Sequence, residues 1–217
     1  TETFISPLNE SSTRGMEQKV FGIVLAGGRG RRLGGLDKAA IIIGGSSTLT
    51  RAKAALSFAD TLAVSGRDGE GAPQINDAKP SKGPLAGLAA GLNWSLEGGA
   101  QWLATAPTDM PFLSALIYRK LLVQADGADV VIASDGSSHH WLVAIWSARL
   151  AHLANASLEG NDLSIAKFAK RLRCRILVFP GEKALFANIN TEADLESVRK
   201  NIARDDVFDA LASTSKT

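Results

Sequence analysis

Short apolar runs alternate with longer amphipathic stretches from about residue 20 to residue 203. The runs are rich in Val and Ile, as buried parallel strands are, and the amphipathic stretches have the length of crossover helices. This alternation is typical of α/β proteins with a mostly parallel sheet flanked by helices. It predicts strands over residues 20–25, 61–64, 101–105, 130–133, 142–146, 175–179 and 186–189. It predicts helices near residues 48–59, 84–96, 113–124, 148–155, 163–171 and 192–202.

The same pattern indicates a single domain over residues 20–203. No break in composition, internal repeat or long Pro/Ser-rich linker divides this stretch. Residues 1–19 have neither the basic start nor the apolar core of a secretory signal, so we expect a flexible N-terminal leader. Residues 204–217 turn to small and polar side chains, so we expect a flexible C-terminal tail.

Composition excludes several classes of protein. With 45% hydrophobic and 21% charged residues, the chain is not of the disordered type. A formal charge of +2 is too small for a broad basic surface, so we expect no nucleic-acid partner. The apolar runs are far shorter than the roughly 20 residues that span a bilayer, so we expect no membrane partner. Cys174 is the only cysteine, which excludes an intrachain disulfide and fits a cytoplasmic location.

Ligands of open α/β sheets bind at the carboxyl ends of the strands, and a glycine-rich segment follows the first predicted strand. Residues 25–38, LAGGRGRRLGGLDK, contain five glycines and four cationic residues. Glycines let backbone N–H groups approach phosphate oxygens while cations neutralise the charge, so the segment predicts a loop suited to a triphosphate. The alternative is a glycine turn with solvated arginines. The P-loop motif is absent, and Leu33 replaces the third glycine of the dinucleotide motif.

Asp109 is the candidate metal ligand. It follows an apolar run, and Pro107 and Pro111 stiffen the turn around it, which predicts a carboxylate at the rim of the sheet. Mg²⁺ is commonly bound by one or two carboxylates together with substrate phosphate oxygens and water. The alternative is that Asp109 caps the helix beginning near Leu113, although Ser114 makes that cap less necessary.

Four segments together resemble the molybdenum cofactor guanylyltransferase family. They are the glycine-rich segment, GPLAG at residues 83–87, PTDMPF at residues 107–112 and FANINT at residues 186–191. Their order and spacing are those of the family, and they cover almost the whole predicted domain. The resemblance implies a Rossmann-like nucleotidyltransferase fold. It also implies Mg²⁺-dependent transfer of GMP from GTP to the phosphate of molybdenum-molybdopterin, with release of pyrophosphate.

The resemblance also implies roles for individual residues. The first loop would wrap the nucleotide phosphates through Leu25, Ala26, Gly27 and Gly28. Lys38 would reach the phosphates with Arg32 as a helper, Asp109 would bind the catalytic Mg²⁺, and Asn190, with Asn188 as a second candidate, would lie near the metal and the transferred phosphate. Asn190 also has an alternative role, because Asn and Thr before a helix are ordinary capping residues.

Three more positions are expected to contact the nucleotide. Asp77 matches an aspartate that contacts guanosine in the family, although an aspartate in a surface turn is the alternative. Gly83 opens a predicted helix, whose N-terminus favours an anion or a closely approaching base. Ser65 follows the second strand, where the family often has asparagine.

The remaining polar and aromatic residues give weaker signals. The three histidines lack the spacing of a zinc site, and His140 matches a family histidine for which we expect a structural or substrate-orienting role. We expect Trp141 and Trp146 to pack in the core, with an aromatic contact to the pterin as the alternative. Five cationic residues between 167 and 175 predict a solvated face, with attraction of an anionic pterin phosphate or a partner as the alternative.

Two features of the resemblance favour GTP over CTP. The first loop reads LAGG, where cytidylyltransferases usually have LAAG, and the second motif reads GPLAG. The alternatives are a cytidylyl or sugar-1-phosphate nucleotidyltransferase of the same fold, and a non-catalytic carrier of nucleotide or cofactor. The resemblance also raises a protein partner, either a molybdenum-insertion protein or an apo-molybdoenzyme chaperone.

Overall fold

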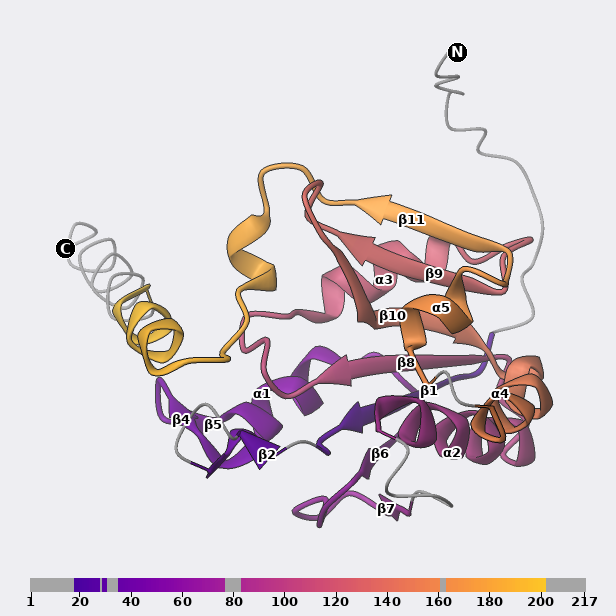
Figure 1. Ribbon diagram of the computed structural model, residues 1–217, viewed down its shortest axis with the longest axis horizontal. Coiled ribbons are helices and arrows are strands. Elements are labelled where there is room, and N and C mark those ends of the chain that lie inside the picture. Colours follow the sequence, from indigo (N-terminus) through magenta and orange to yellow (C-terminus); the bar gives the residue numbers. More distant parts are fainter. Residues whose placement is uncertain (1–17, 28, 31–34, 77–82, 161–162, 202–217) are drawn as a thin grey trace, which may run out of the picture.

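A seven-stranded sheet forms the centre of the molecule in the computed structural model, which describes residues 18–27, 29–30, 35–76, 83–160 and 163–201 (Figure 1). The strand order is β11-β9-β10-β8-β1-β6-β7, and every strand except β10 runs in the same direction. The predicted α/β architecture is therefore confirmed. The strands are β1 (Val20–Leu25), β6 (Thr61–Ser65), β7 (Gln74–Ile75), β8 (Trp102–Pro107), β9 (Val130–Ser134), β10 (His139–Ser147) and β11 (Cys174–Val178).

The central strand β1 ends level with its two neighbours in the sheet. All six of its residues are buried, as expected for a parallel strand covered on both faces. It pairs with β6 and β8, and its last residue, Leu25, lies opposite Ser65 of β6 and Pro107 of β8. The carboxyl ends of three neighbouring strands therefore meet at one edge of the sheet.

Helices cover both faces of this sheet, and each face buries its own apolar cluster. Val24 of β1 packs in the cluster with α1 (Thr48–Ala55) and α3 (Ala115–Val123). Its neighbour Ile23 packs on the opposite face, because successive side chains of a strand alternate. That face is covered by α2 (Pro84–Glu97), α4 (Ala151–Leu158) and α5 (Ile165–Ala169).

A third, smaller apolar cluster lies at the carboxyl edge. Residues 192–201 are helical, and Leu195 and Val198 pack there with Ile41, Ile43 and Ile189. The hydrophobic pattern did not predict two small hairpins, and Figure 1 shows the second of them beside this helix. They are β2 (Arg29–Gly30) with β3 (Leu36–Asp37), and β4 (Ile42–Ile43) with β5 (Ser46–Ser47). This packing brings the end of the glycine-rich segment close to the last predicted motif.

One predicted strand is wrong. Residues 186–189 form no strand, because the short helix η5 (Lys183–Phe186) is followed by irregular backbone. The N–H of Ile189 donates to the carbonyl of Asp109 at 2.8 Å instead of to a neighbouring strand. The segment therefore lies across the loop after β8 and does not extend the sheet.

The six predicted helices are all present with different bounds: α1, α3 and α5 are shorter than predicted, whereas α2 and α4 end further along the chain. The predicted helix at 148–155 is a 3₁₀ turn, η4 (Ala148–Leu150), followed by α4. Thr191 and Asp194 form reciprocal hydrogen bonds between side chain and backbone at the start of the helical residues 192–201, as in a capping box. Among the described helices, none combines the length and apolarity needed to cross a membrane.

Candidate active site

A small cavity opens where β1 and β8 end. Its volume is about 170 Å³, and it lies at the carboxyl edge, where ligands of parallel sheets bind. The lining residues are Leu25, Gly27, Lys38, Pro107, Thr108, Asp109 and Leu142. Four of the residues that the sequence assigned to nucleotide or metal, Leu25, Gly27, Lys38 and Asp109, thus line one cavity.

Lys38 is held between two other predicted site residues. Its Nζ donates to Asp109 Oδ2 at 3.2 Å and to Asn190 Oδ1 at 2.7 Å. Lys38 begins the 3₁₀ helix η2 (Lys38–Ala40), Asp109 follows β8, and Asn190 precedes the helical residues 192–201. Three segments far apart in the sequence therefore meet at one ammonium group. With side chains only 18% and 25% exposed, the Lys38–Asp109 ion pair is partly shielded from solvent.

The geometry decides against a capping role for Asp109. The N-cap position of α3 is Ser114, five residues further along the chain. The Asp109 carboxylate faces Lys38, and its backbone carbonyl accepts from Ile189. The side chain of Asp109 thus connects the loop after β8 to Lys38, and its backbone connects the same loop to Ile189.

The start of the glycine-rich segment packs backbone to backbone against the loop after β6. Ala26 N–H donates to the carbonyl of Ser65 at 3.0 Å. Gly66 has φ +89°, and a Cβ at this position would lie 2.7 Å from the backbone nitrogen of Gly27. A Cβ at Gly27 itself would meet no atom of the described residues within 4 Å. The backbone at Gly27 is therefore supported on one side and open on the other, as a phosphate-binding turn requires.

Ser65 and Gly83 occupy the same edge. Ser65 ends β6 with its side chain buried, and its carbonyl is the group that holds Ala26. Gly83 is the N-cap of α2 with φ +66°, Pro84 follows it, and no side chain of the described residues caps this helix end. The N-terminus of α2 thus presents backbone N–H groups at this edge of the sheet.

Several predicted residues are not placed. Gly28, Arg32 and Asp77 lie outside the described residues, so their roles stay predictions. Asn188 lies two residues before Asn190, and its buried Oδ1 has no hydrogen-bond partner in the described part of the chain. A buried oxygen without a donor is a feature of ligand sites, because natural proteins leave few such atoms unpaired.

His140 belongs to a separate pair at the start of β10. Its Nε2 lies 3.2 Å from Asp135 Oδ2, and its ring stacks on Phe186 with centroids 4.4 Å apart. Burial lowers the pKa of His140, against the opposing effect of the Asp135 charge. Hydrogen bonds from Ser137 and Ser138 hold the pKa of Asp135 well below its usual range. The pair supports the predicted structural role of His140.

The two tryptophans differ in burial. Trp146 is fully buried, as predicted, and donates from Nε1 to Thr105 Oγ1 at 3.0 Å. Trp141 is only half-buried, with Lys170 Nζ 5.8 Å from its ring centroid.

The site contains residues that the sequence analysis did not select. Leu142 lines the cavity because β10 is antiparallel to β8 and so brings its first residues to the carboxyl edge. The antiparallel direction of β10 could have been inferred from the short connection after β9, because four residues are too few for a parallel crossover. Arg67 was also missed, and it forms an ion pair with Asp37 next to Lys38. No local pattern predicts that pair, since the two residues are 30 positions apart.

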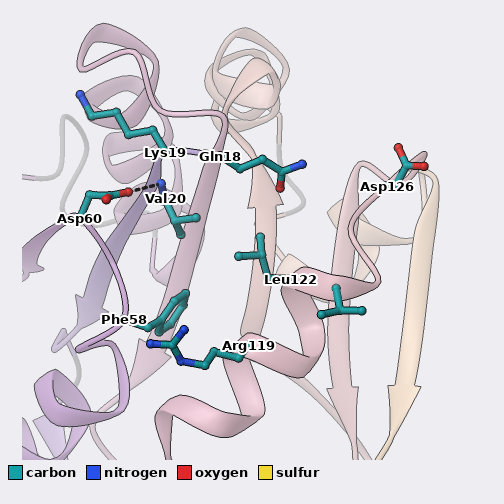
Figure 2. Close-up of a pocket in the computed structure, with 9 residues that line it drawn as sticks. Gln18, Lys19, Val20, Phe58, Asp60, Arg119, Leu122 and Asp126 are labelled. Carbon is teal, nitrogen blue, oxygen red and sulfur yellow. Dashed lines mark hydrogen bonds between the residues drawn. The ribbon is translucent and has the colours of Figure 1, made fainter. Parts of the chain in front are cut away.

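A second cavity, of about 830 Å³, opens at the opposite edge of the sheet (Figure 2). Here the Asp60 carboxylate accepts from the N–H of Val20, and the Arg119 guanidinium lies 5.9 Å from the centroid of the Phe58 ring. None of the predicted catalytic residues lines it. The lining residues are Gln18, Lys19, Val20, Phe58, Asp60, Arg119, Leu122, Val123 and Asp126.

The sequence matches the model of a known family. Residues 22–174 match the MobA-like NTP transferase domain. The chain belongs to the MobA-like NTP transferase family. This membership confirms the resemblance noted above and the expected enzyme class, a nucleotidyltransferase.

Relatives of this MobA-like chain carry consistent names. A molybdenum cofactor guanylyltransferase from Acidiphilium cryptum is 38% identical over 184 residues, covering 81% of this chain and 91% of the relative. One from Cereibacter sphaeroides is 34% identical over 194 residues, covering 86% and 99%. The fold is similar to that of molybdopterin-guanine dinucleotide biosynthesis protein A from Archaeoglobus fulgidus, with a TM-score of 0.69 and 23% identity over 85% of this chain and 99% of that one.

Proposed function

We propose that this protein transfers GMP from GTP to the phosphate of molybdenum-molybdopterin and releases pyrophosphate. The observation that carries the proposal is the placement of Lys38 between Asp109 and Asn190, next to the open backbone of Gly27. Nucleotidyl transfer depends mainly on positioning and on stabilising charge at the attacked phosphorus. A glycine turn and a fixed ammonium group supply both.

Each residue around the cavity has a separate role in the reaction. Backbone N–H groups around Gly27 hold the phosphates of GTP, and Lys38 stabilises the negative charge that grows around the α-phosphorus. Asn190 keeps the ammonium group of Lys38 aimed at the cavity. An oxygen of the acceptor phosphate forms a bond to the α-phosphorus of GTP. At the same time the bond breaks between the α-phosphorus and the oxygen that bridges it to the β-phosphorus. The electron pair of the broken bond leaves with pyrophosphate.

The donor set at Asp109 fits Mg²⁺. Among the described residues, no three His, Cys, Asp or Glu side chains lie close enough to hold a metal ion on their own. Asp109 offers one partly exposed carboxylate, which matches the habit of Mg²⁺ to combine few protein ligands with phosphate oxygens and water. When bound, the ion would neutralise charge on the phosphates. Asp109 is the residue that would hold it.

Two features support GTP as the nucleotide. The chain has the LAGG and GPLAG motifs, and its named relatives are guanylyltransferases. A related fold also occurs in the 4-diphosphocytidyl-2C-methyl-D-erythritol synthase of Anaerococcus prevotii, with a TM-score of 0.63 and 15% identity. The fold alone therefore does not select the base, and nucleotide choice has to be measured.

Pyrophosphate release from purified protein tests the proposal. The protein is mixed with Mg²⁺, molybdenum-loaded molybdopterin and one of GTP, CTP, ATP or UTP. We expect release with GTP alone. Release with CTP alone would replace guanylyl by cytidylyl transfer. Nucleotide binding without release in any mixture would favour a non-catalytic carrier. In a parallel set with a sugar 1-phosphate in place of molybdopterin, release in that set alone would change the acceptor. A molybdenum-insertion or chaperone partner and a cytoplasmic location stay predictions.

A further inference from the structure

Arg67 connects the loop after β6 to the residue that precedes Lys38. Its Nη1 forms an ion pair with Asp37 Oδ2, and its Nη2 lies 3.7 Å from Glu70 Oε1. The Arg67 side chain is 24% exposed, and its buried Nε has no hydrogen-bond partner among the described residues. The guanidinium is thus partly withdrawn from solvent and is oriented by Asp37, whereas Glu70 lies beyond hydrogen-bond distance and its side chain is 46% exposed.

Asp37 uses both carboxylate oxygens at this point. Oδ1 accepts from the N–H of Ala39 at 3.0 Å and so caps the 3₁₀ helix that Lys38 begins, while Oδ2 faces Arg67. The carbonyl of Lys38 accepts from the Thr48 hydroxyl. Hydrogen bonds therefore fix the backbone on both sides of Lys38, and this fixes the point from which its side chain extends to Asp109.

The turn that carries Arg67 is itself anchored to the core. Lys53 of α1 donates to the carbonyls of Gly69 and Glu70 at 3.1 and 3.0 Å. Gly66, directly before Arg67, packs against the backbone of Gly27. Arg67 therefore links the segment that ends in Lys38 to a turn that is held in place by α1 and by the loop after β1.

The ion pair also has an electrostatic consequence. Asp37 carries a negative charge one residue from Lys38, at the edge where a triphosphate would bind. An unpaired carboxylate there would repel the nucleotide, whereas a guanidinium partner neutralises it. A lysine at position 67 would keep the charge but would lose the planar fork with which arginine holds a carboxylate.

We infer that Arg67 is a positioning residue for the reaction: through Asp37 it fixes the Lys38 backbone and shields the nucleotide from the Asp37 charge. This inference rests on the proposed function, because it assigns Arg67 to the same site. It predicts that misplacing Lys38 affects kcat, whereas exposing the Asp37 charge affects the KM for GTP. Arg67→Lys should lower kcat with little change in the KM for GTP, and Arg67→Ala should lower kcat and raise that KM.

The test combines kinetics with chemical labelling of Lys38. Pyrophosphate release and acylation of Lys38 by an amine-reactive ester, quantified by peptide mass spectrometry against the exposed Lys200, are measured in the same set of proteins. The set is wild type, Arg67→Lys, Arg67→Ala, Asp37→Asn, the Arg67→Ala/Asp37→Asn double variant and the control Glu70→Gln. Asparagine keeps an oxygen to cap Ala39, so Asp37→Asn removes the charge and spares the cap.

We expect kcat/KM of Arg67→Ala to fall by about 10- to 100-fold, since small displacements of a catalytic group have effects of this size. Labelling of Lys38 should rise severalfold, Glu70→Gln should match wild type, and the double variant should lose little more than either single variant. Wild-type kinetics and labelling in Arg67→Ala, or losses that multiply in the double variant, would overturn the inference. If the wild type released no pyrophosphate from GTP, the proposed function would fail, while Lys38 labelling would still decide the role of Arg67.

Discussion

At the scale of single residues, one ammonium group between a carboxylate and an amide dominates the site. Lys38, Asp109 and Asn190 come from three separate segments: Lys38 begins η2, Asp109 follows the end of β8, and Asn190 precedes the helical residues 192–201. The glycine-rich segment that ends in Lys38 and the turn with Asp109 could be predicted to meet because parallel strands end at a common edge. Asn190 came from the family resemblance, since the strand expected before it is absent. The Asp37–Arg67 pair could not, because it depends on the packing of two loops and leaves no local pattern.

Replacing the Asp109 carboxylate tests the predicted metal and charge site. We expect Asp109→Asn to abolish turnover, because the variant loses the negative charge that pairs with Lys38 and replaces the anionic oxygen donor for Mg²⁺ by a neutral amide oxygen. Circular dichroism and the melting temperature should show an intact fold. The control is Asp126→Asn, which removes a carboxylate at the opposite edge of the sheet (Figure 2). Full activity in Asp109→Asn would remove this residue from the catalytic set.

At the scale of elements, the strands and helices follow the hydrophobic pattern, and the exceptions have tertiary causes. β1 was predicted with its observed bounds because all its residues are apolar or small and buried. Residues 186–189 have the same local character but bond to the loop after β8. The two hairpins after β1 have strands of two residues each, too short for any periodicity to appear. They nevertheless carry Asp37 to its place before Lys38.

The contact between the loops after β1 and β6 can be tested with two glycines of nearly equal backbone conformation. Gly66 has φ +89° and Gly71 has φ +92°, but only at Gly66 would a Cβ strike backbone, that of Gly27. Gly71→Ala should cost about 1–3 kcal/mol of unfolding free energy from backbone strain alone. Gly66→Ala should cost more and should also weaken GTP binding. Denaturant unfolding and a nucleotide titration measure both, and equal behaviour of the two variants would contradict the contact.

At the scale of the whole molecule, an ion-pair group on the opposite edge contributes to stability. Asp129, just before β9, binds Arg173 before β11 and Arg149 after β10. Its carboxylate also accepts from the backbone N–H of Arg173 at 3.0 Å. The Arg173 hydrogen bond is the main reason why the pKa of Asp129 lies well below its usual range. The group joins three strands far from the active site.

This lowered pKa predicts a loss of stability in acid. The folded carboxylate stays ionised where the unfolded one, with a pKa of about 3.9, takes up a proton. The stabilisation from Asp129 is therefore complete above about pH 5 and is lost as the pH falls through 4 and below. Arg173→Gln should flatten the acid limb of a plot of melting temperature against pH. The control Arg175→Gln, which removes a bond to the Gln124 carbonyl, should leave that limb unchanged.

The central claim is the transfer of GMP to an acceptor, and the fate of isotopic label tests it most directly. The wild-type protein is incubated with Mg²⁺, molybdenum-loaded molybdopterin and GTP labelled either at the α- or at the γ-phosphorus. We predict that α-label moves into the molybdopterin product and that γ-label appears only in pyrophosphate. Release of α-label as free GMP, or transfer of α-label from CTP in place of GTP, would contradict the account.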